Sequence, residues 1–443
     1  MLDHDRDCFE LREEIIVIGT STLRSRDPTG YRPLRPETVP SYLHASGVVD
    51  RFLGGPSAKW QARECGDGNL NLVFVVRGAT GAVVLKQALP YVRMVGESWP
   101  LSVRRNFFEH AALQEQSRWA AEFVPAVYGN DEGMALIAME FLTPHSVLRS
   151  ELIAARTYLR VGKHLGLFLA RTLFNTSDLR LTSAEKKERV AIFLANTPMC
   201  QISEDLIFDE PYFNSPSNRH TSPQLDSVVS SLARDTDLKV AVQGMKWQFL
   251  NQPECLIHGD LHTGSIMVTE SETRVIDPEF AFYGPMGFDI GVLLANILMA
   301  YFSQPGHEVR GAERGEYGSY LLDQLAAVWT TFAAEFSRLW HERGSREGNL
   351  CHPRLEHDSP KFSGQALTGR LQRIWDDALG FAGCEMIRRI VGLAHVADFE
   401  TIIDPDRRAE CERRSIVVAR SLLLQRARYQ CLSDVTADAR ACE

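Results

Sequence analysis

The sequence predicts an α+β protein of two lobes, a small β-rich lobe followed by a larger, mostly helical one. Short strand patterns separated by glycine-containing turns fill the chain from about residue 60 to 142. Helical periodicity then dominates from Leu152 onward. We therefore expect an N-lobe over residues 31–142 and a helical C-lobe over 143–443. Residues 1–30 show no sustained period and are expected to be an N-terminal extension.

Composition excludes several function classes. The 443 residues carry a formal net charge of -9 and no Lys/Arg block, which argues against nucleic acid or an anionic membrane surface as partner. The nine cysteines show no metal-binding spacing, and the N-terminus has no secretory apolar core, so we expect a cytoplasmic protein. The longest apolar segment, Ile290 to Phe302, is too short to span a bilayer and is predicted to be a buried helix.

The first strands of the N-lobe enclose a glycine-rich turn. It contains Gly66, Gly68 and Asn69, and a second turn at 78–81 precedes a strand over 82–86. Glycines let backbone N–H groups approach phosphates without a Cβ clash. Asn71 stands where a third glycine of a G-x-G-x-x-G pattern would be, so an ordinary hairpin remains an alternative.

Lys86 ends an apolar strand, where a lysine is costly to bury unless it is paired. Phosphate oxygens and a glutamate from a helix predicted over 103–123 are its natural partners. That helix offers Glu109 and Glu115, of which we favour Glu109. An exposed edge lysine is the alternative. The segment 92–100 is predicted to be a loop carrying Trp99.

Strands are then predicted at 127–128 and 134–142, and the C-lobe follows. Its expected helices cover residues 157–174, 183–195, 224–249, 321–340, 370–400 and 408–427, with polar irregular segments at 214–223 and 344–369. Within 370–400, Arg388 and His395 are seven residues apart and would share a helical face near Asp398. Such a cluster suggests anion handling, and surface ion pairs are the alternative.

Two neighbouring segments carry the chemistry. His258-Gly259-Asp260 places one carboxylate in a tight turn, and Asp277-Pro278-Glu279 offers two more that would share a face in extended chain. Phosphoryl transfer from ATP needs one carboxylate to receive the proton of the attacking hydroxyl and others to hold Mg²⁺. A structural His-Gly-Asp turn in an unrelated α/β protein is the alternative.

This ordered set resembles the protein-kinase-like fold in its small-molecule form, as in aminoglycoside and choline kinases. Five runs resemble 5-methylthioribose kinases in particular: residues 66–71, 96–100, 258–265, 277–285 and 387–400. The resemblance covers roughly residues 31–430, but not 1–30 or 344–369. It implies a kinase of methionine salvage that transfers the ATP γ-phosphate to the anomeric 1-hydroxyl of 5-methylthioribose, a small sugar. It also implies Mg²⁺ as cofactor and a cytoplasmic homodimer.

The resemblance further implies roles for individual residues around the nucleotide. It places Gly66, Gly68 and Asn69 in the loop over ATP and Lys86 on the phosphates. The backbone of Glu140, Phe141 and Leu142 would hydrogen-bond adenine. The metal-binding segment would be Asp277-Pro278-Glu279, with Asp277 and Glu279 as the Mg²⁺ ligands.

On the sugar side, the resemblance makes Asp260 the catalytic aspartate. Arg388 and Arg389 would lie near the substrate and the transferring phosphate, with Trp99 and His395 also in the substrate site.

One position departs from the wider kinase pattern. Ser265 stands where an asparagine usually binds Mg²⁺, five residues after the catalytic aspartate. Glu279 replaces the glycine of Asp-Phe-Gly, so we expect the metal site to be shifted onto Asp277 and Glu279.

Three other functions remain open at this point. The chain could phosphorylate a different small alcohol or amine, such as choline, homoserine or an aminoglycoside, although Arg388 and Arg389 disfavour a polycationic substrate. It could also be an inactive nucleotide-binding scaffold, or an interaction domain that binds no nucleotide.

Overall fold

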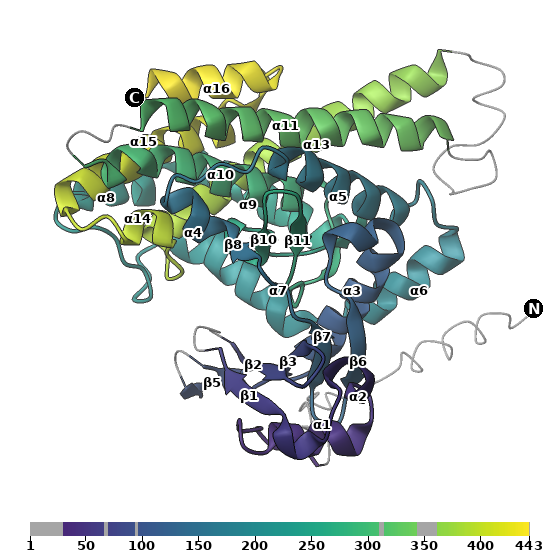
Figure 1. The fold of residues 1–443 in the computed structure, drawn as a ribbon. Coiled ribbons are helices and arrows are strands. Elements are labelled where there is room, and N and C mark those ends of the chain that lie inside the picture. Colours follow the sequence, from purple (N-terminus) through teal and green to yellow (C-terminus); the bar gives the residue numbers. More distant parts are fainter. Residues whose placement is uncertain (1–29, 66–69, 94–95, 310–313, 343–360, 443) are drawn as a thin grey trace, which may run out of the picture.

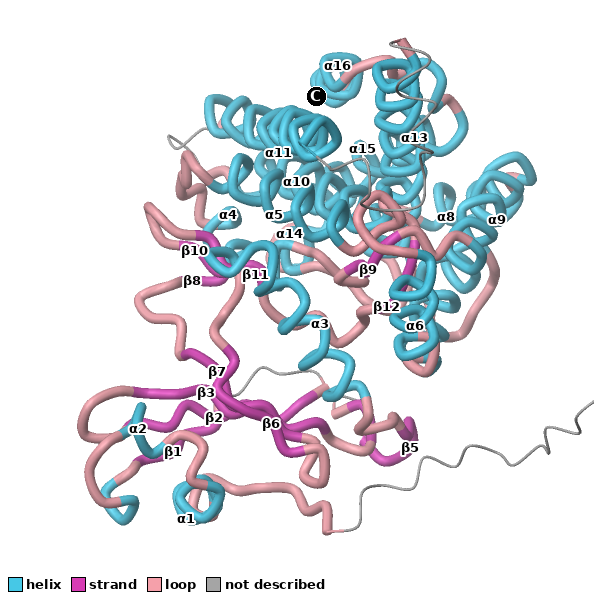
Figure 2. Tube along the Cα trace, turned by 90° about the vertical axis from the view of Figure 1, so that its right-hand side faces the viewer, coloured by secondary structure: helices cyan, strands magenta, loops and turns pink. Residues whose placement is uncertain are grey.

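The computed structural model describes residues 30–442, except 66–69, 94–95, 310–313 and 343–360. The predictions for residues 1–29, for Gly66, Gly68 and Asn69, and for most of 344–369 therefore lie outside the described residues. The β-rich part and the helical part occupy opposite ends of the molecule (Figure 1). Figure 2 shows helix α3 between the two parts.

The N-lobe is built on an antiparallel sheet with strand order β1-β2-β3-β7-β6. Its strands are β1 Gln61–Glu64, β2 Asn71–Arg77, β3 Ala82–Ala88, β6 Val127–Asp131 and β7 Leu136–Glu140. A separate short pair, β4 Tyr91–Val92 and β5 Gly96–Pro100, lies beside it. The helical elements are α1 Val39–Ser46, α2 Asp50–Leu53, η1 Ser57–Lys59, α3 Arg105–Ala120 and η2 Ala121–Phe123.

The two faces of β3 have different neighbours because side chains alternate along a strand. Val83 and Leu85 are fully buried in the core that includes residues of α1 and α2. Val84 packs toward the C-lobe core instead. Lys86 is two residues after Val84, so the same alternation directs its side chain toward the C-lobe.

The C-lobe is mostly helical, as predicted. Its helices are α4 Leu148–Ile153, α5 Val161–Asn175, α6 Ser183–Phe193, α7 Thr197–Ser203, α8 Asp226–Arg234, α9 Thr236–Asn251, α10 Gly287–His307, α11 Gly315–Glu342, α13 Phe362–Val391, α14 Ala397–Glu400, α15 Pro405–Leu424 and α16 Leu432–Ala441. The short turns are η3 Glu204–Asp209, η4 Glu210–Tyr212, η5 Thr263–Ser265 and η6 Arg426–Arg428.

Helix α10 is the centre of the C-lobe and packs against α11, α13 and α15. A Cβ on Gly291 would lie 2.5 Å from the Ala378 carbonyl oxygen, so glycine is needed for this close approach to α13. The helix is longer than the predicted Ile290 to Phe302. Its length and composition would suffice to cross a membrane, but its most apolar window is entirely buried inside the protein, as expected for a core helix.

Several predicted boundaries are wrong. The segment 92–100 is not a loop throughout, because β4 and β5 pair within it. The helix predicted over 224–249 is two helices, because the Asp235 carboxylate accepts a hydrogen bond from Leu238 N–H and caps α9. Helix α13 begins at Phe362, inside the predicted irregular segment, and ends at Val391. These boundaries were mispredicted because the hydrophobic periodicity of the sequence continues across them.

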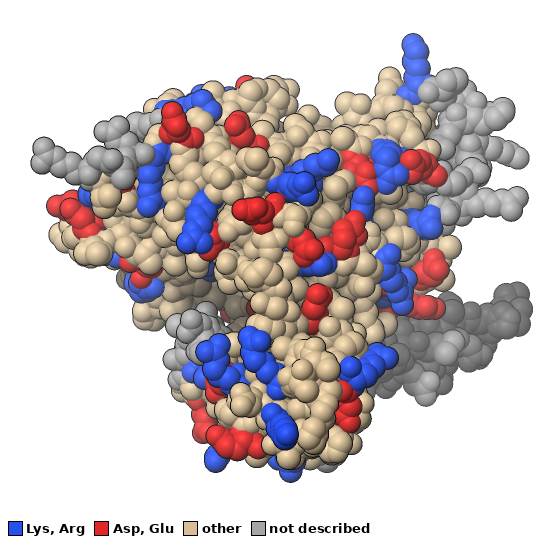
Figure 3. Space-filling view, in the orientation of Figure 1, with Lys and Arg blue, Asp and Glu red and all other residues tan. Residues whose placement is uncertain are grey.

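Positive and negative side chains are interspersed on the face shown in Figure 3. This distribution agrees with the absence of a Lys/Arg block in the sequence.

Glu412 on α15 provides a test of stability against pH. Its side chain is fully buried, and burial raises its pKa to about 7 from the usual 4.5, opposed by the Thr221 hydroxyl and Arg408. A carboxyl whose folded pKa is raised destabilises the fold as pH rises from about 4.5 to 7, and this penalty is complete above pH 7. Glu412→Gln should therefore raise Tm by about 2 °C at pH 8.

The same substitution should leave Tm unchanged at pH 4, where Glu412 is protonated in both the folded and the unfolded state. Differential scanning calorimetry measures Tm at both pH values. Glu410→Gln is the matched control, because Glu410 lies on the same helix and pairs with Arg413 and Arg414 at the surface. An equal gain at both pH values would show that Glu412 is not titrating.

Candidate active site

Two strand ladders hold the two carboxylate-bearing loops. Strands β9 Cys255–Ile257 and β12 Phe282–Gly284 form one antiparallel pair. Strand β10 Ile266–Val268 pairs with β11 Thr273–Val275 and with β8 Ser146–Val147. Residues 258–265 connect β9 to β10, and residues 276–281 connect β11 to β12. Both loops are therefore fixed at each end by the same two ladders.

The two loops touch at Gly259. Its φ is +84°, and a Cβ there would lie 2.3 Å from the Phe280 carbonyl oxygen, so this position requires glycine. Asp277 also has a positive φ of 72°, which is uncommon for a residue with a side chain. The prediction of extended chain from Asp277 to Glu279 is wrong, because β11 has already ended and the backbone turns at Asp277. The strained backbone at Asp277 marks a candidate functional position.

Asp289 organises the first loop and was missed as a site residue. Its carboxylate accepts hydrogen bonds from the backbone N–H groups of His258 (2.6 Å) and Gly259 (3.0 Å). The His258 ring then joins the loops: Nε2 donates to the Ile276 carbonyl at 2.9 Å, and Nδ1 accepts from Asp260 N–H at 3.3 Å. In the sequence, Asp289 appeared only as an acidic residue near a helix start.

Asp289→Asn should therefore impair the loop without touching the reacting groups. An amide offers one acceptor where the carboxylate offers two, and it turns N–H donors toward backbone N–H groups. We expect a loss of about 1–3 kcal/mol in the free energy of unfolding. We also expect kcat to fall about tenfold while nucleotide affinity stays within a factor of two. Chemical denaturation and steady-state kinetics measure both, and an unchanged kcat would contradict this role.

Asp260 lies against the paired arginines of α13. Arg388 Nη2 and Arg389 Nη2 reach Asp260 Oδ1 at 3.3 and 3.2 Å. The Nε atoms of both arginines donate to the fully buried Glu385, which fixes the two guanidinium groups. His262 Nε2 lies 3.4 Å from Asp260 Oδ2. Burial, with the charges of Arg149 and Arg389, holds the pKa of His262 well below its usual range, so its ring is neutral at neutral pH.

His395 does not share a helical face with Arg388, so that prediction is wrong. Helix α13 ends at Val391, and His395 follows in the connection to α14. Its Nδ1 lies 3.0 Å from Glu400 Oε1, and its Nε2 lies 2.9 Å from the Arg219 carbonyl oxygen. Asp398 instead forms an ion pair with Arg149 at 3.3 Å.

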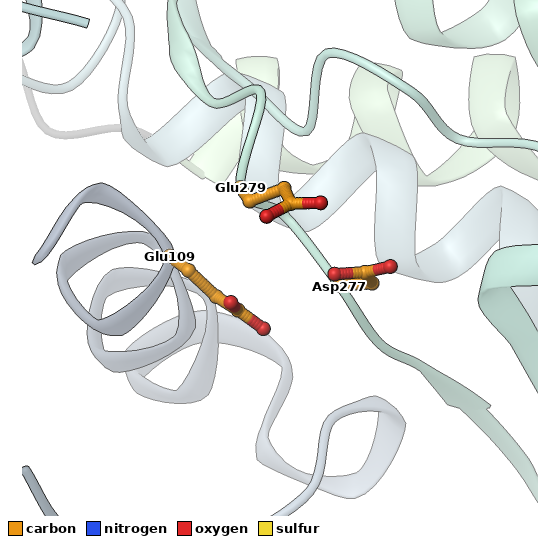
Figure 4. A group of neighbouring side chains, drawn as sticks. All are labelled: Glu109, Asp277 and Glu279. Atoms are coloured by element: carbon orange, nitrogen blue, oxygen red, sulfur yellow. The ribbon is translucent and has the colours of Figure 1, made fainter. Parts of the chain in front are cut away.

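Three acidic side chains converge between the lobes (Figure 4). Carboxylate oxygens of Glu109 on α3 and of Asp277 and Glu279 on the second loop lie within 4.8 Å of one another. Lys86 Nζ joins this cluster, donating to Glu109 Oε1 at 2.8 Å and forming a closer ion pair with Asp277. The preference for Glu109 over Glu115 is confirmed, because Glu115 pairs with Arg118 and Arg189.

The charges of this acidic cluster are unbalanced. Burial alone lowers the pKa of Lys86, but Asp277, Glu109 and Glu279 outweigh that effect and raise it. Burial also raises the pKa of Glu109 and of Glu279, and repulsion from Asp277 adds to this. The raised pKa of Lys86 favours its charged form and so an ion pair, whereas the raised pKa of Glu109 favours the neutral carboxyl. The 2.8 Å contact between Lys86 Nζ and Glu109 Oε1 is that of an ion pair, and the pKa of Glu109 is raised first by burial and then by the neighbouring carboxylates. A hard divalent cation with oxygen ligands fits such a group.

Two polar residues that sequence reasoning did not assign to the site also reach Glu279. Asn71 Nδ2 and Arg105 Nε donate to Glu279 Oε2 at 2.9 and 3.2 Å. In the sequence, Asn71 stands out only as the residue in place of a third glycine. Arg105 carried no signal in the sequence, because its partners come from distant segments.

The remaining predicted residues lie as follows. The buried Ser265 hydroxyl is bonded to the Asp260 carbonyl and lies 3.1 Å from His262 Nδ1, so it is engaged within its own loop. Glu140 N–H donates to the Ala126 carbonyl, so this backbone donor is engaged within the N-lobe. Trp99 is half-buried on β5, at the edge of the N-lobe (Figure 1).

Comparisons with known proteins give a family match and several relatives of this chain. Residues 61–334 match the model of the phosphotransferase enzyme family. Methylthioribose kinase of Escherichia coli O45:K1 is 41% identical over 93% of this chain and 98% of its own length. Methylthioribose kinase 1 of Oryza sativa subsp. japonica is 41% identical over 92% of this chain and 94% of its own. A solved glucosamine kinase complex is far more distant, with a TM-score of 0.46 at 11% identity over 87% of this chain and 86% of that one.

Proposed function

This chain belongs to the methylthioribose kinases, within the phosphotransferase enzyme family, and we propose that it phosphorylates the anomeric 1-hydroxyl of 5-methylthioribose. It is an ATP-dependent kinase of methylthioribose that acts in methionine salvage. The fold is protein-kinase-like, as predicted. The proposal adds the position of attack, the product 5-methylthioribose 1-phosphate, Mg²⁺, and the roles of individual residues.

The carboxylate cluster with Lys86 at its centre carries the proposal. Asp277 and Glu279 would hold Mg²⁺, which neutralises charge on the triphosphate when it is bound. Lys86 is positioned by Glu109 and Asp277 and would donate to phosphate oxygens. The engagement of Ser265 within its loop supports a cation site shifted onto Asp277 and Glu279.

Asp260 would orient the sugar hydroxyl and accept its proton. An anomeric hydroxyl is more acidic than an ordinary alcohol, so an aspartate suffices as the acceptor. Arg388 and Arg389 are fixed by Glu385 with their Nη2 atoms at Asp260, where they would stabilise negative charge on the transferring phosphoryl group. Holding both reactants in line supplies much of the rate acceleration.

The remaining roles concern the nucleotide and the sugar. Gly66, Gly68 and Asn69 would cover the phosphates, and the backbone from Glu140 to Leu142 would bind adenine. Pro278 would restrict the backbone between Asp277 and Glu279, because its ring fixes φ. Trp99 and His395 would belong to the sugar side. We also propose a cytoplasmic homodimer.

A coupled assay of ADP formation tests the proposed function. It uses 5-methylthioribose, choline, homoserine and kanamycin as acceptors, and NMR of the product identifies the phosphorylated carbon. We expect turnover with 5-methylthioribose alone and a phosphate on C1. Preferred turnover of another acceptor would overturn the substrate assignment. Stabilisation by ATP and Mg²⁺ without any product would indicate a nucleotide-binding scaffold.

A further inference from the structure

Arg105 opens helix α3 at the junction of the two lobes. Its guanidinium is completely buried, and the whole residue is only 1% exposed. A guanidinium has five N–H donors, and here all five are used. Nε donates to Glu279 Oε2, Nη1 to the carbonyls of Leu89 (2.8 Å) and Ser102 (3.0 Å), and Nη2 to the Leu70 carbonyl (2.8 Å) and Asn71 Oδ1 (2.9 Å).

The partners of Arg105 belong to four separate segments. Leu70 and Asn71 stand at the start of β2, Leu89 follows the strand that carries Lys86, and Ser102 precedes α3. Glu279 comes from the C-lobe. Because a guanidinium is planar and its donors form a fixed fork, it sets the relative positions of these groups more strictly than an ammonium could.

Asn71 adds a second link between the same groups. Its side-chain oxygen accepts from Arg105, and its Nδ2 donates to the Glu279 oxygen that Arg105 contacts. Within the described residues, both hydrogen bonds accepted by the Glu279 side chain end on Oε2. The other oxygen, Oε1, is then the one that a cation would use.

A buried guanidinium is not explained by stability alone. Replacing a buried ion pair by apolar side chains of similar volume is often neutral or stabilising. Arg105 is therefore better understood through the position it imposes than through the energy of its contacts. Hydrogen bonds that orient a metal ligand change metal affinity by 10–100-fold when they are removed.

We infer that Arg105 is a positioning residue for phosphoryl transfer, which holds Glu279 Oε2 so that Oε1 is offered to the divalent cation. It also ties this carboxylate to Leu70 and Asn71 at the start of β2. The inference rests on the proposed role of Glu279 as a cation ligand. Because all five donors of Arg105 are used by protein groups, it would act on neither reactant directly.

Arg105→Gln and Arg105→Lys test this inference. The measured quantities are the Mg²⁺ concentration for half-maximal activity and the Mg²⁺-dependent affinity for ADP, the latter by calorimetry without turnover. For Arg105→Gln we expect both to weaken about 10-fold or more, with KM for 5-methylthioribose within twofold. Arg105→Lys keeps the charge without the fork and should give an intermediate shift. Asn71→Ala should shift both in the same direction by less.

Arg370→Gln is the matched control. Arg370 is also largely buried and pairs with Glu254, a residue outside the acidic cluster. It should lower Tm without changing the Mg²⁺ dependence. The inference is overturned if the Arg105 variants lower Tm in the same way and leave the Mg²⁺ dependence unchanged. Should Arg105→Gln fail to fold, Arg105→Lys and Asn71→Ala decide the question by the same criterion.

Glu279→Gln separates this inference from the proposed function. If Glu279→Gln leaves the Mg²⁺ dependence unchanged, the cation-ligand assignment itself fails. If Glu279→Gln weakens it and the Arg105 variants do not, only the role of Arg105 fails. When both are right, the double variant should show no larger shift than Glu279→Gln alone, because Arg105 acts through that carboxylate.

Discussion

Asp260→Asn should lower kcat by about 10³-fold, because a positioned general base contributes about 10²–10⁴-fold and none of the other carboxylates that the structure describes is placed to replace it. Glu385 is an acidic side chain on the arginine side, but it is fully buried and bound by both arginines. Asp260 is separate from the acidic cluster that would hold the cation, so affinity for ADP and Mg²⁺ should stay within threefold. Single-turnover kinetics and calorimetry measure the two quantities.

The exposed Asp406→Asn on α15 is the control for this substitution. It should leave kcat unchanged. If Asp260→Asn retains more than a tenth of the wild-type kcat, Asp260 is not the proton acceptor. A parallel loss of nucleotide affinity would instead place Asp260 in the cation site.

Asp277→Asn should have the second large effect. Unlike Asp260→Asn, it should weaken the binding of nucleotide and Mg²⁺ as well as the rate. Asp277 is the carboxylate that contacts Lys86 most closely and faces Glu109 and Glu279. Its loss removes a cation ligand and frees Lys86 from one of its two partners. A bound metal contributes several kcal/mol of charge stabilisation, and each 1.36 kcal/mol is a factor of ten in rate. We expect kcat/KM for ATP to fall about 10³-fold or more.

The choice of asparagine matters for Asp277. Its φ of 72° is tolerated better by Asn than by most residues, so the variant isolates the lost charge from backbone strain. Calorimetry with ADP and Mg²⁺ should show binding weakened at least 100-fold, whereas Asp323→Asn on the exposed face of α11 should not change it. Unaltered Mg²⁺-dependent binding in Asp277→Asn would refute the cation site.

The sequence predicted the main chemistry because much of it is local. His258-Gly259-Asp260 and Asp277-Pro278-Glu279 each lie within a few residues, and the need for a helix glutamate beside Lys86 followed from the cost of burying a lysine. The strand and helix types also followed from short-range periodicity. Predictions failed where one contact interrupts a continuing pattern, as the Asp235 cap does between α8 and α9.

Other parts of the site depend on distant segments. Asp289 supports the Asp260 loop across about thirty residues of chain, and Arg105 meets Glu279 from the other lobe. Neither contact leaves a repeating pattern in the sequence. The prediction that Arg388 and His395 share a face was wrong because α13 ends at Val391, where Gly392 is the C-cap, and periodicity alone does not mark that end.

The sequence by itself determined the class of protein, the two lobes and the identity of the acidic and basic groups, because residue type and spacing encode local structure and chemistry. Only the tertiary structure decided how those groups are oriented: which glutamate binds Lys86, which oxygen of Glu279 is engaged, and how the two loops interlock at Gly259. The physical reason is that a buried charge is stable only beside specific partners, and those partners are brought together by folding from far apart in the chain.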